Sequence, residues 1–435
     1  MKIYRTPNLW NLAKKLIPGG NGLLSKRPNR YLPEYWPTYF KEAKGIKIKT
    51  LNNKNFIDMS NMGVGASILG YSNTFVNKKV KKAIDKGIST TLNCKEEYEL
   101  AKEFLKHDKF AKNVKFARSG GEAMSIAIRI ARANSKNDKI AFSGYHGWHD
   151  WYLATNLKGK ENLKEHLLPG LNPLGVPKAL KNTVIPFRYN NIKDFKKIIS
   201  RNKLAAVVVE GSRFEYPKKD FIKEINNFCK KKKVCLIIDE ITSGWRETIG
   251  GVYKSLGFNP DIVVYGKGIG NGYAISAIVG KSKLMRACED TFISSTAWTE
   301  RVGFVSALAT INFFKKRKVH KHIKKIGNYL ISNWIKLAKK NNLEISTNKF
   351  VALSKFEFNY KNKNNYLNTL FTQEMLKEGY LATNSVYISY SHKKKDIDKY
   401  LKSCDKVFKK IYFAQKTNKN YLYGEVKSMG FKRLT

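Results

Sequence analysis

The sequence has few acidic residues, few cysteines and no long hydrophobic run. Its five cysteines, at positions 94, 229, 235, 288 and 404, show no C-x-x-C spacing, which argues against a zinc site and against a secreted disulfide framework. No apolar stretch is long enough to span a bilayer, and residues 1–10 lack the hydrophobic segment of a signal peptide. We therefore expect a cytoplasmic protein with no membrane contact and no bound metal.

The scarcity of acidic residues leaves a formal net charge of +48, from 82 Lys and Arg against 34 Asp and Glu. A basic chain suggests a nucleic-acid partner, because clustered Lys and Arg displace counterions from phosphates. Here the lysines are spread in short runs, as at 78–82, 230–233 and 393–395, and no nucleic-acid-binding motif accompanies them. We interpret them as solvated faces that bind polyanions only non-specifically, at low salt. A basic polyanion-binding protein is the non-enzymatic alternative.

Short apolar runs alternate with helical patterns between residues 114 and 280. The expected strands are 114–117, 139–143, 183–187, 204–210, 234–239, 261–265 and 274–280. Helical patterns at 122–134, 194–200 and 221–231 lie between several of them. This alternation predicts an α/β fold with a mostly parallel seven-stranded sheet. Ligands of such sheets gather at the carboxyl ends of the strands, so the residues there are the candidates for function.

The rest of the chain has a different character. Residues 1–40 carry scattered prolines and aromatic residues and predict an extended arm. After residue 300, helical patterns at 301–315, 322–340, 365–378 and 394–412 surround one expected strand at 350–360, which is typical of a separate α+β domain. We expect an N-terminal arm with part of the small domain at 1–60, a large domain at 61–312 and a small C-terminal domain at 313–435.

Two of the expected strand ends are followed by glycine-rich turns. Ser119, Gly120 and Gly121 directly precede a helix, where free amides and small side chains make a cup for a phosphate, although a plain helix cap has the same sequence. Tyr145 and His146 lie between Gly144 and Gly147 and would suit a wall against which a flat ring stacks. An aromatic turn without a ligand, or histidine ligands to a metal, are the alternatives.

Two further strand ends carry charged residues. Asp239 and Glu240 follow a buried apolar run, and burying a carboxylate is costly without a cationic partner. Metal binding, a general base and pairing with a cationic ring nitrogen are all open for them. Lys267 comes 28 residues after Asp239 (267 − 239) and lies between glycines at the end of the next strand. In a dry cleft such a lysine loses its proton and forms an imine with a carbonyl, whereas a solvated lysine does not.

A phosphate cup, a stacking aromatic ring, a buried carboxylate and an isolated lysine at one sheet edge fit pyridoxal phosphate. This cofactor has a phosphate, a flat pyridine ring, a ring nitrogen that works best when protonated, and an aldehyde that joins a lysine. The four features together therefore predict a pyridoxal-phosphate enzyme.

The chain resembles the class III aminotransferases of fold type I, and within them the glutamate-1-semialdehyde 2,1-aminomutase branch. The motifs that carry the resemblance are S-G-G-E-A at 119–123, G-Y-H-G at 144–147, D-E-I-T-S-G-W-R at 239–246, N-P-D-I at 259–262 and G-K-G-I-G-N-G at 266–272. It implies a large domain with the seven-stranded sheet, a smaller α+β domain, and a homodimer with shared active sites. Small-molecule amines and carbonyl compounds are the implied substrates.

The resemblance also implies roles for individual residues. Lys267 would bond to the cofactor and move protons, and Asp239 would pair with the pyridine nitrogen. Tyr145 would stack above the ring and Ile241 would pack beneath it. The other implied cofactor-binding residues are Ser119, Gly120 and Gly121 at the phosphate, His146, Glu210, and Thr296, which would reach a phosphate in the partner subunit.

Departures from the family pattern fall on the substrate side. Asn21–Arg27 replaces the N-S-P-V-R stretch whose serine and arginine hold the substrate carboxylate in the aminomutases, and Asn384 replaces a glutamate. Gly121 and Gly211 replace a threonine and a proline, whereas Gly244-Trp245-Arg246 resembles the aminomutase branch. We expect an aminomutase-like shift of the amine within one molecule. The alternative is a transaminase with a separate donor that acts on a sugar or another precursor for the cell surface or secondary metabolism.

Overall fold

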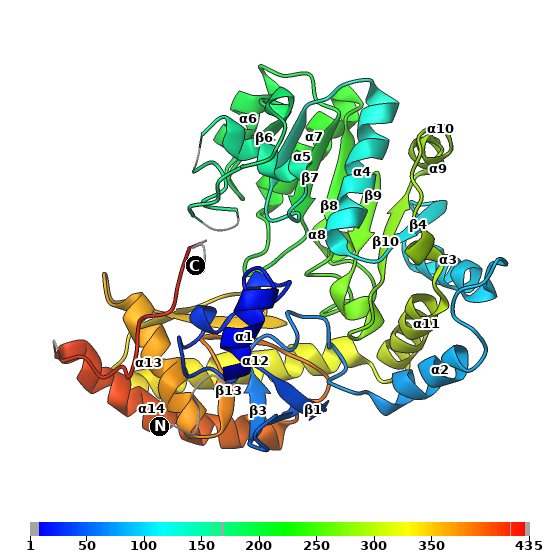
Figure 1. Ribbon diagram of the computed structural model, residues 1–435. Coiled ribbons are helices and arrows are strands. Elements are labelled where there is room, and N and C mark those ends of the chain that lie inside the picture. The colour runs from blue at the N-terminus through cyan, green and yellow to red at the C-terminus, as the bar shows by residue number, and fades with distance from the viewer. Residues whose placement is uncertain (1–7, 160, 167–168, 418, 431–435) are drawn as a thin grey trace. The chain divides into compact units, whose positions relative to one another are not determined.

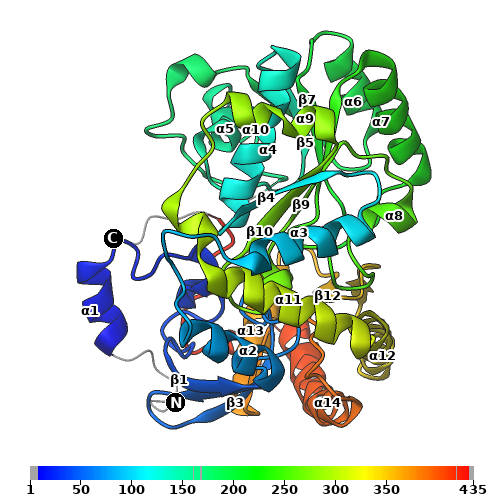
Figure 2. The ribbon, with the colours of Figure 1, turned by 90° about the vertical axis from the view of Figure 1, so that its right-hand side faces the viewer.

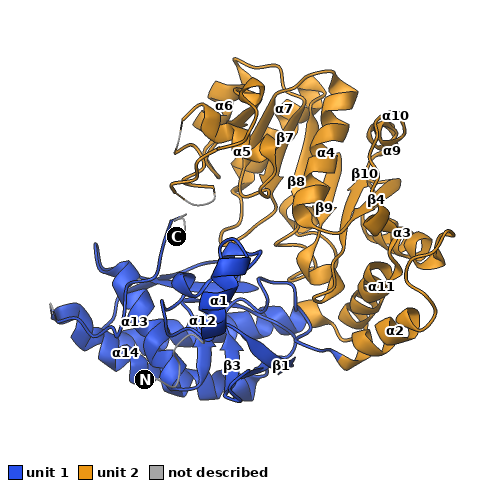
Figure 3. Cartoon of the chain, in the orientation of Figure 1, with its two compact units in different colours: residues 1–73, 321–435 blue, residues 74–320 orange. Residues whose placement is uncertain are grey.

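The computed structural model describes residues 8–159, 161–166, 169–417 and 419–430. The chain divides into two compact units, one formed by residues 1–73 and 321–435 and the other by residues 74–320 (Figure 3). The chain passes from one unit to the other after Asn73 and after His320. The expected domain limits of 1–60, 61–312 and 313–435 remain predictions. Within the described ranges, no helix combines the length and the apolar character that a membrane-spanning segment needs.

The second unit is built around a seven-stranded sheet (Figure 1). Its strands, in spatial order, are β4 (Asn113–Ala117), β10 (Ser276–Gly280), β9 (Ile262–Tyr265), β8 (Cys235–Asp239), β7 (Ala206–Glu210), β5 (Ile140–Ser143) and β6 (Val184–Pro186). Only β10 runs antiparallel to its neighbours. Each observed strand coincides with an expected one, so the predicted α/β fold with a mostly parallel seven-stranded sheet is confirmed.

The central strands are buried at every position because helices cover both faces of the sheet. Helix α4 (Gly120–Ser135) packs against one face, where Ala127 and Ile130 join Val208, Ile237 and Val264 in a single apolar cluster. Figure 2 shows α7 (Lys219–Lys232) on the opposite side. Continuous β-branched runs therefore form these strands, since neither face meets water.

The remaining elements of this unit are shorter or lie away from the sheet. They are α2 (Thr74–Ile84), α3 (Lys95–His107), α5 (Asp150–Leu153), η4 (Ala154–Leu157), η5 (Lys178–Leu180), α6 (Ile192–Ile199), α8 (Tyr253–Leu256), η6 (Lys267–Gly270), α9 (Ser282–Met285), α10 (Ala287–Asp290), η7 (Thr296–Thr299) and α11 (Arg301–Lys316). Helix α11 packs against α2, α3 and η6.

The first unit combines the two ends of the chain. One sheet has the order β1 (Phe40–Lys44), β2 (Lys47–Thr50), β3 (Asn55–Met59) and β13 (Tyr380–Ala382), and the other has β11 (Ile345–Thr347), β12 (Leu353–Phe358) and β14 (Ser385–Tyr387). Its helices are α1 (Asn8–Leu16), η2 (Leu24–Lys26), η3 (Pro28–Arg30), α12 (Val319–Lys340, which begins in the other unit), α13 (Asn364–Lys377) and α14 (Lys394–Lys416). Strand β13 pairs in parallel with β3, which joins C-terminal to N-terminal residues.

The expectation of an extended arm is wrong for the described part of residues 1–40. Helix α1 and two 3-10 turns occupy much of it. Leu32 is fully buried, and the rings of Tyr31 and Trp36 stack with centroids 4.4 Å apart within a cluster that includes Phe56 and Leu381. Tyr31, Leu32 and Trp36 therefore form part of the core of this unit.

The C-terminal tail, residues 419–430, lies along α13 and is held by polar contacts. Gln373 Nε2 donates to the carbonyl of Tyr421 (3.1 Å) and Asn365 Nδ2 to that of Lys427 (2.9 Å). The Arg30 guanidinium donates to the carbonyl of Ser428 (2.7 Å). The tail thus connects α13 with the N-terminal segment.

Candidate active site

Four parallel strands bring the candidate residues to one edge of the sheet. Strands β5, β7, β8 and β9 end there, and the register pairs Glu210 with Asp239, and Asp239 with Val264. His146 follows β5, and Lys267 follows β9 by two residues. The expected gathering of functional side chains at the carboxyl ends of the strands is therefore present in the structure.

Lys267 combines an unusual backbone conformation with a strongly lowered pKa. Its φ is +46°, a value that L-residues rarely adopt. Its Nζ donates to Thr242 Oγ1 at 2.7 Å. Burial, together with the positive charges of Arg213 and Arg246, lowers the pKa of the amine from its usual value to about 7. Near neutral pH a large share of Lys267 is thus the free amine, which is the nucleophilic form.

Asp239 is 4% exposed and is paired with a buried histidine. Its Oδ2 lies 2.8 Å from His146 Nδ1, and its Oδ1 accepts a hydrogen bond from the backbone N–H of Ile241 (2.9 Å). His146 Nε2 lies 3.2 Å from the carbonyl oxygen of Ser143, so both ring nitrogens face acceptors. His146 therefore positions Asp239 and does not share a stacking wall with Tyr145.

Glu210, Arg213 and Tyr145 form a second charged group at this edge. Glu210 Oε1 accepts from Arg213 Nε (3.0 Å) and Nη2 (2.6 Å), while its Oε2 accepts from the backbone N–H of Tyr145 (3.1 Å). The guanidinium of Arg213 lies 5.5 Å from the centroid of the Tyr145 ring. Arg213 and His146 hold the pKa of the buried Glu210 carboxyl below its usual range, although burial opposes them.

The glycines of the site let backbone and side chains come close together. A Cβ on Gly120 would lie 2.9 Å from Ile241 Cδ1, and a Cβ on Gly266 would lie 3.3 Å from Ile241 Cγ2. A Cβ on Gly121 would lie 2.8 Å from His149. Ile241 thus packs against the glycine turn before α4 and the glycine before Lys267.

Ser119 caps α4, as the helix-cap alternative for this turn predicts. Its Oγ accepts from the backbone N–H of Glu122, whose carboxylate accepts from the N–H of Ser119 (2.7 Å). Thr296 is exposed at the start of η7. Arg118 connects the two segments, because its guanidinium donates to the carbonyl of Ala297 (2.5 Å). The Thr296 carbonyl accepts a hydrogen bond from Thr299 Oγ1 (3.3 Å) within the same turn.

Glu240 has a structural role, unlike its neighbour Asp239. It accepts hydrogen bonds from Ser243 Oγ (2.5 Å) and from the N–H of Tyr253 (2.8 Å), away from Lys267. Burial raises the pKa of its carboxyl to about 7.

The described residues contain no group of three or more His, Cys, Asp or Glu side chains that could hold a metal ion, and the five cysteines are free thiols.

Sequence reasoning missed Arg213, Thr242 and Arg246. Thr242 and Arg246 belong to the D-E-I-T-S-G-W-R motif, where each was quoted without a role. Arg213 had one usable signal, since it is the first cationic residue after the strand that ends at Glu210.

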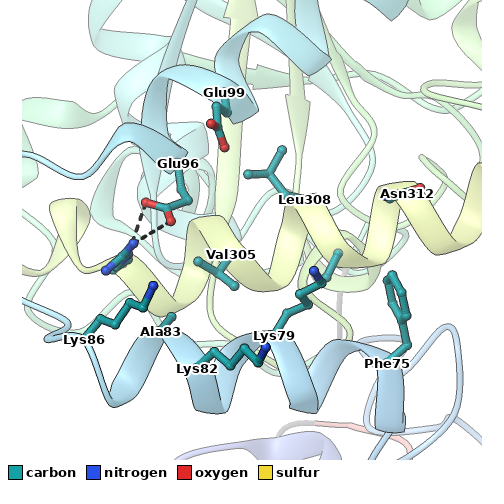
Figure 4. A pocket seen from close by; sticks show the side chains of 12 residues that line it. Phe75, Lys79, Lys82, Ala83, Lys86, Glu96, Glu99, Val305, Leu308 and Asn312 are labelled. Carbon is teal, nitrogen blue, oxygen red and sulfur yellow. Dashed lines mark hydrogen bonds and ion pairs between the residues drawn. The ribbon is translucent and has the colours of Figure 1, made fainter.

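A separate hollow of about 390 Å³ lies between α2, α3 and α11, and none of its lining residues belongs to the group around Lys267 (Figure 4). Lys79 and Lys82 of α2, with Lys86 two residues beyond its end, face Glu96 and Glu99 of α3 across it. Val305 and Leu308 of α11 supply apolar surface. The Arg301 guanidinium closes an ion pair with Glu96 (2.7 Å).

Comparison with known proteins gives one consistent family. The model of the aminotransferase class-III family matches residues 32–407. The chain is 30% identical over 431 residues to the glutamate-1-semialdehyde 2,1-aminomutase of Wigglesworthia glossinidia brevipalpis, covering 93% of this chain and 97% of that protein. It is 30% identical over 329 residues to the 3-aminobutyryl-CoA aminotransferase of Cloacimonas acidaminovorans (strain Evry), covering 73% and 75%.

Solved structures show the same fold. The PLP internal aldimine form of the Sphingopyxis sp. MTA144 FumI protein matches with a TM-score of 0.85 at 21% identity, over 95% of this chain and 98% of that one. An omega-transaminase from Sphaerobacter thermophilus matches with a TM-score of 0.82 at 20% identity, over 93% and 97%. The fold expected from the motifs is thereby confirmed.

Proposed function

The chain belongs to the class III aminotransferases, and on this basis we propose that it is an aminomutase-like enzyme that uses Lys267 and Asp239 to move an amino group. Family membership confirms the expected enzyme class, its amine and carbonyl substrates and its cofactor, pyridoxal phosphate. The observation that carries the residue assignment is the nearly neutral pKa of the Lys267 amine, at the same sheet edge as the buried Asp239–His146 pair.

The residues present fit this cofactor. Gly120 and Gly266 leave space that a Cβ would fill beside Ile241, as a flat ring that rests on this side chain requires. We assign the ring nitrogen to Asp239, the upper ring face to Tyr145 and the lower face to Ile241. We assign the phosphate to Ser119, Gly120 and Gly121, together with Thr296 from the other subunit of a homodimer. His146 positions Asp239 through its ring nitrogen, and Glu210 positions Tyr145 by accepting its backbone N–H.

When bound, pyridoxal phosphate supplies an aldehyde that condenses with amines and a cationic ring that withdraws electrons from the adjacent carbon. Lys267 Nζ would take the proton from the substrate carbon that carries the amine and would return it to the former aldehyde carbon of the cofactor, on the other side of the shared nitrogen. Its pKa of about 7 suits it to both transfers. Asp239 would lie next to the ring nitrogen, and His146 Nδ1, 2.8 Å from its Oδ2, fixes its orientation there. Thr242 Oγ1 accepts from Nζ and fixes its position.

The aminomutase assignment rests on the coverage of its relatives. Glutamate-1-semialdehyde 2,1-aminomutases match more than nine tenths of this chain at 28–30% identity. In that version the amine migrates within one molecule and glutamate-1-semialdehyde gives 5-aminolevulinate.

Transfer between two molecules is the second candidate, with a sugar or another precursor for the cell surface or secondary metabolism as acceptor. Two observations favour it: Asn21–Arg27 and Asn384 depart from the aminomutase pattern, and a 3-aminobutyryl-CoA aminotransferase is among the relatives.

Two measurements test the proposal. The purified protein should show the absorbance of bound cofactor, which Lys267→Ala abolishes and Lys281→Ala, a surface lysine paired with Asp261, leaves unchanged. A colourless protein that retains polyanion binding would favour the non-enzymatic alternative. Incubation with glutamate-1-semialdehyde and no amino donor should yield 5-aminolevulinate. Turnover only after addition of glutamate and a keto sugar would select the transaminase.

A mixing experiment tests the shared site. We propose a cytoplasmic homodimer in which Lys267 and Thr296 of different subunits act together. If so, the inactive variants Lys267→Ala and Thr296→Ala regain activity when mixed, because each hybrid dimer contains one site with both native residues. No recovery in dimers shown to exchange subunits would contradict this arrangement.

A further inference from the structure

The substrate side of the site contains a cation that the cofactor assignment leaves unused. The proposed function, on which this inference rests, requires a group that orients the substrate above Lys267. The N-S-P-V-R spacing that holds the carboxylate in the aminomutases is lost in Asn21–Arg27, where Ser25 and Arg27 stand four and six residues after Asn21. A guanidinium is suited to this task because its planar fork binds both oxygens of a carboxylate.

Arg213 occupies such a position. It lies three residues beyond the end of β7, with two nitrogens on Glu210 Oε1 and its guanidinium over the ring of Tyr145. Its charge acts on Lys267 more strongly than any other side chain does. The same guanidinium therefore lies over the assigned stacking residue and acts electrostatically on the reacting amine.

The turn that carries Arg213 is anchored on both sides. Tyr189 OH donates to the carbonyls of Glu210 and Gly211 (both 3.2 Å), and Ser212 Oγ donates to the carbonyl of Glu215 (2.7 Å). A Cβ at Gly211 would lie 2.8 Å from the Glu240 carboxylate, so glycine permits this close packing. The backbone thus fixes where the guanidinium can reach.

The neighbouring Arg246 differs in accessibility. It is 1% exposed, and its Nε donates to the carbonyl of Thr242 (2.5 Å), which ties it to the fold. The side chain of Arg213 keeps 29% of its surface exposed, and its partner Glu210 keeps 10%. Of the two cations that act on Lys267, Arg213 is the one that an incoming molecule can contact.

We infer that Arg213 is a specificity-determining residue that binds the carboxylate of the substrate, so that the enzyme acts on amino acids and keto acids in preference to uncharged amines. The incoming carboxylate shares the guanidinium with Glu210, and the Tyr145 ring holds the guanidinium plane. Asn21–Arg27 is then not needed for this contact.

The test uses the cofactor-loaded enzyme and a panel of α-, β- and γ-amino acids, each compared with its uncharged carboxamide. Decay of the cofactor absorbance in single turnovers gives kcat and KM for each half-reaction. In Arg213→Gln, kcat/KM for the amino acids should fall by about 10- to 100-fold, mainly through KM, with the carboxamides changed by less than about 3-fold. Arg213→Lys should recover part of the loss. Arg188→Gln, which removes an exposed pair with Asp194, is the matched control.

A second readout separates binding from structure. Acetate and propionate should inhibit the wild type competitively and lose this effect in Arg213→Gln, while its cofactor absorbance and circular dichroism are retained. The inference is overturned if amino acids and carboxamides lose activity together, or if the wild type prefers carboxamides while Lys267 still carries the cofactor. A wild type without cofactor absorbance would remove the proposed function and this inference with it.

Discussion

The most direct test of the site is the protonation of Lys267 in the cofactor-free protein. Its pKa of about 7, against a usual value of 10.5, corresponds to a free-energy penalty on the charged form on the order of 5 kcal/mol. Labelling with a limiting amine-reactive reagent between pH 5 and 11, followed by peptide mass spectrometry, reports the free amine at each lysine. Lys267 should be half-labelled near pH 7 in the folded protein, and near the usual lysine value of about 10.4 once the protein is denatured.

The same shift has a consequence for stability. The unfolded chain holds a proton on this amine up to pH 10.5 and the folded chain only up to about 7, so stability of the cofactor-free protein rises with pH across this window. Lys267→Met should therefore be more stable than the wild type below pH 7, by a few kcal/mol on the order of the penalty above, and the difference should vanish near pH 10.5. A Lys267 labelling midpoint above pH 9.5, or no difference in urea unfolding between the two proteins at pH 7, would refute the assignment of a desolvated amine.

Three further predictions concern neighbouring groups. Asp239→Asn removes the charge paired with His146 and should lower kcat by at least about 100-fold with an unchanged circular dichroism spectrum, whereas the surface change Asp194→Asn should have no such effect. Glu240 keeps its proton up to pH about 7 in the folded protein but only up to about 4.5 when unfolded. The free energy of unfolding of the wild type, measured in urea, should therefore fall by about 3 kcal/mol between pH 4.5 and 7, and Glu240→Gln should abolish this fall. Removal of residues 419–435 should speed amide hydrogen exchange in α13 without changing it in the sheet of the other unit; equal exchange in α13 would show that the tail contacts contribute nothing.

The sheet and its carboxyl-end residues were predictable because they depend on local patterns. Buried parallel strands are continuous apolar runs, and Asp239 and Lys267 directly terminate or follow such runs. The pairing of His146 with Asp239 joins residues 93 positions apart, and no pattern within either segment indicates it. Arg213 was missed for the same reason, since its importance comes from Tyr145, which a different strand positions.

The arm and the tail escaped prediction because their partners lie far away in the chain, apolar for the arm and polar for the tail. The aromatic residues at 31–36 pack against Phe56 and Leu381, and the tail bonds to Asn365 and Gln373 of α13. The prolines and lysines of these segments show no hydrophobic periodicity. The segments therefore become ordered only through contacts with distant parts of the folded chain.

The parallel pairing of β3 with β13 determines the order in which the two units form during synthesis. Residues 74–320 are continuous and are available for folding as soon as they leave the ribosome. Strand β3 can pair with β13 only after Tyr380–Ala382 have been synthesised. At about 5–20 residues per second, the intervening segment takes some tens of seconds to translate. Tyr31, Trp36 and Phe56 remain without Leu376 and Leu381, their C-terminal partners in the apolar cluster, for that whole period.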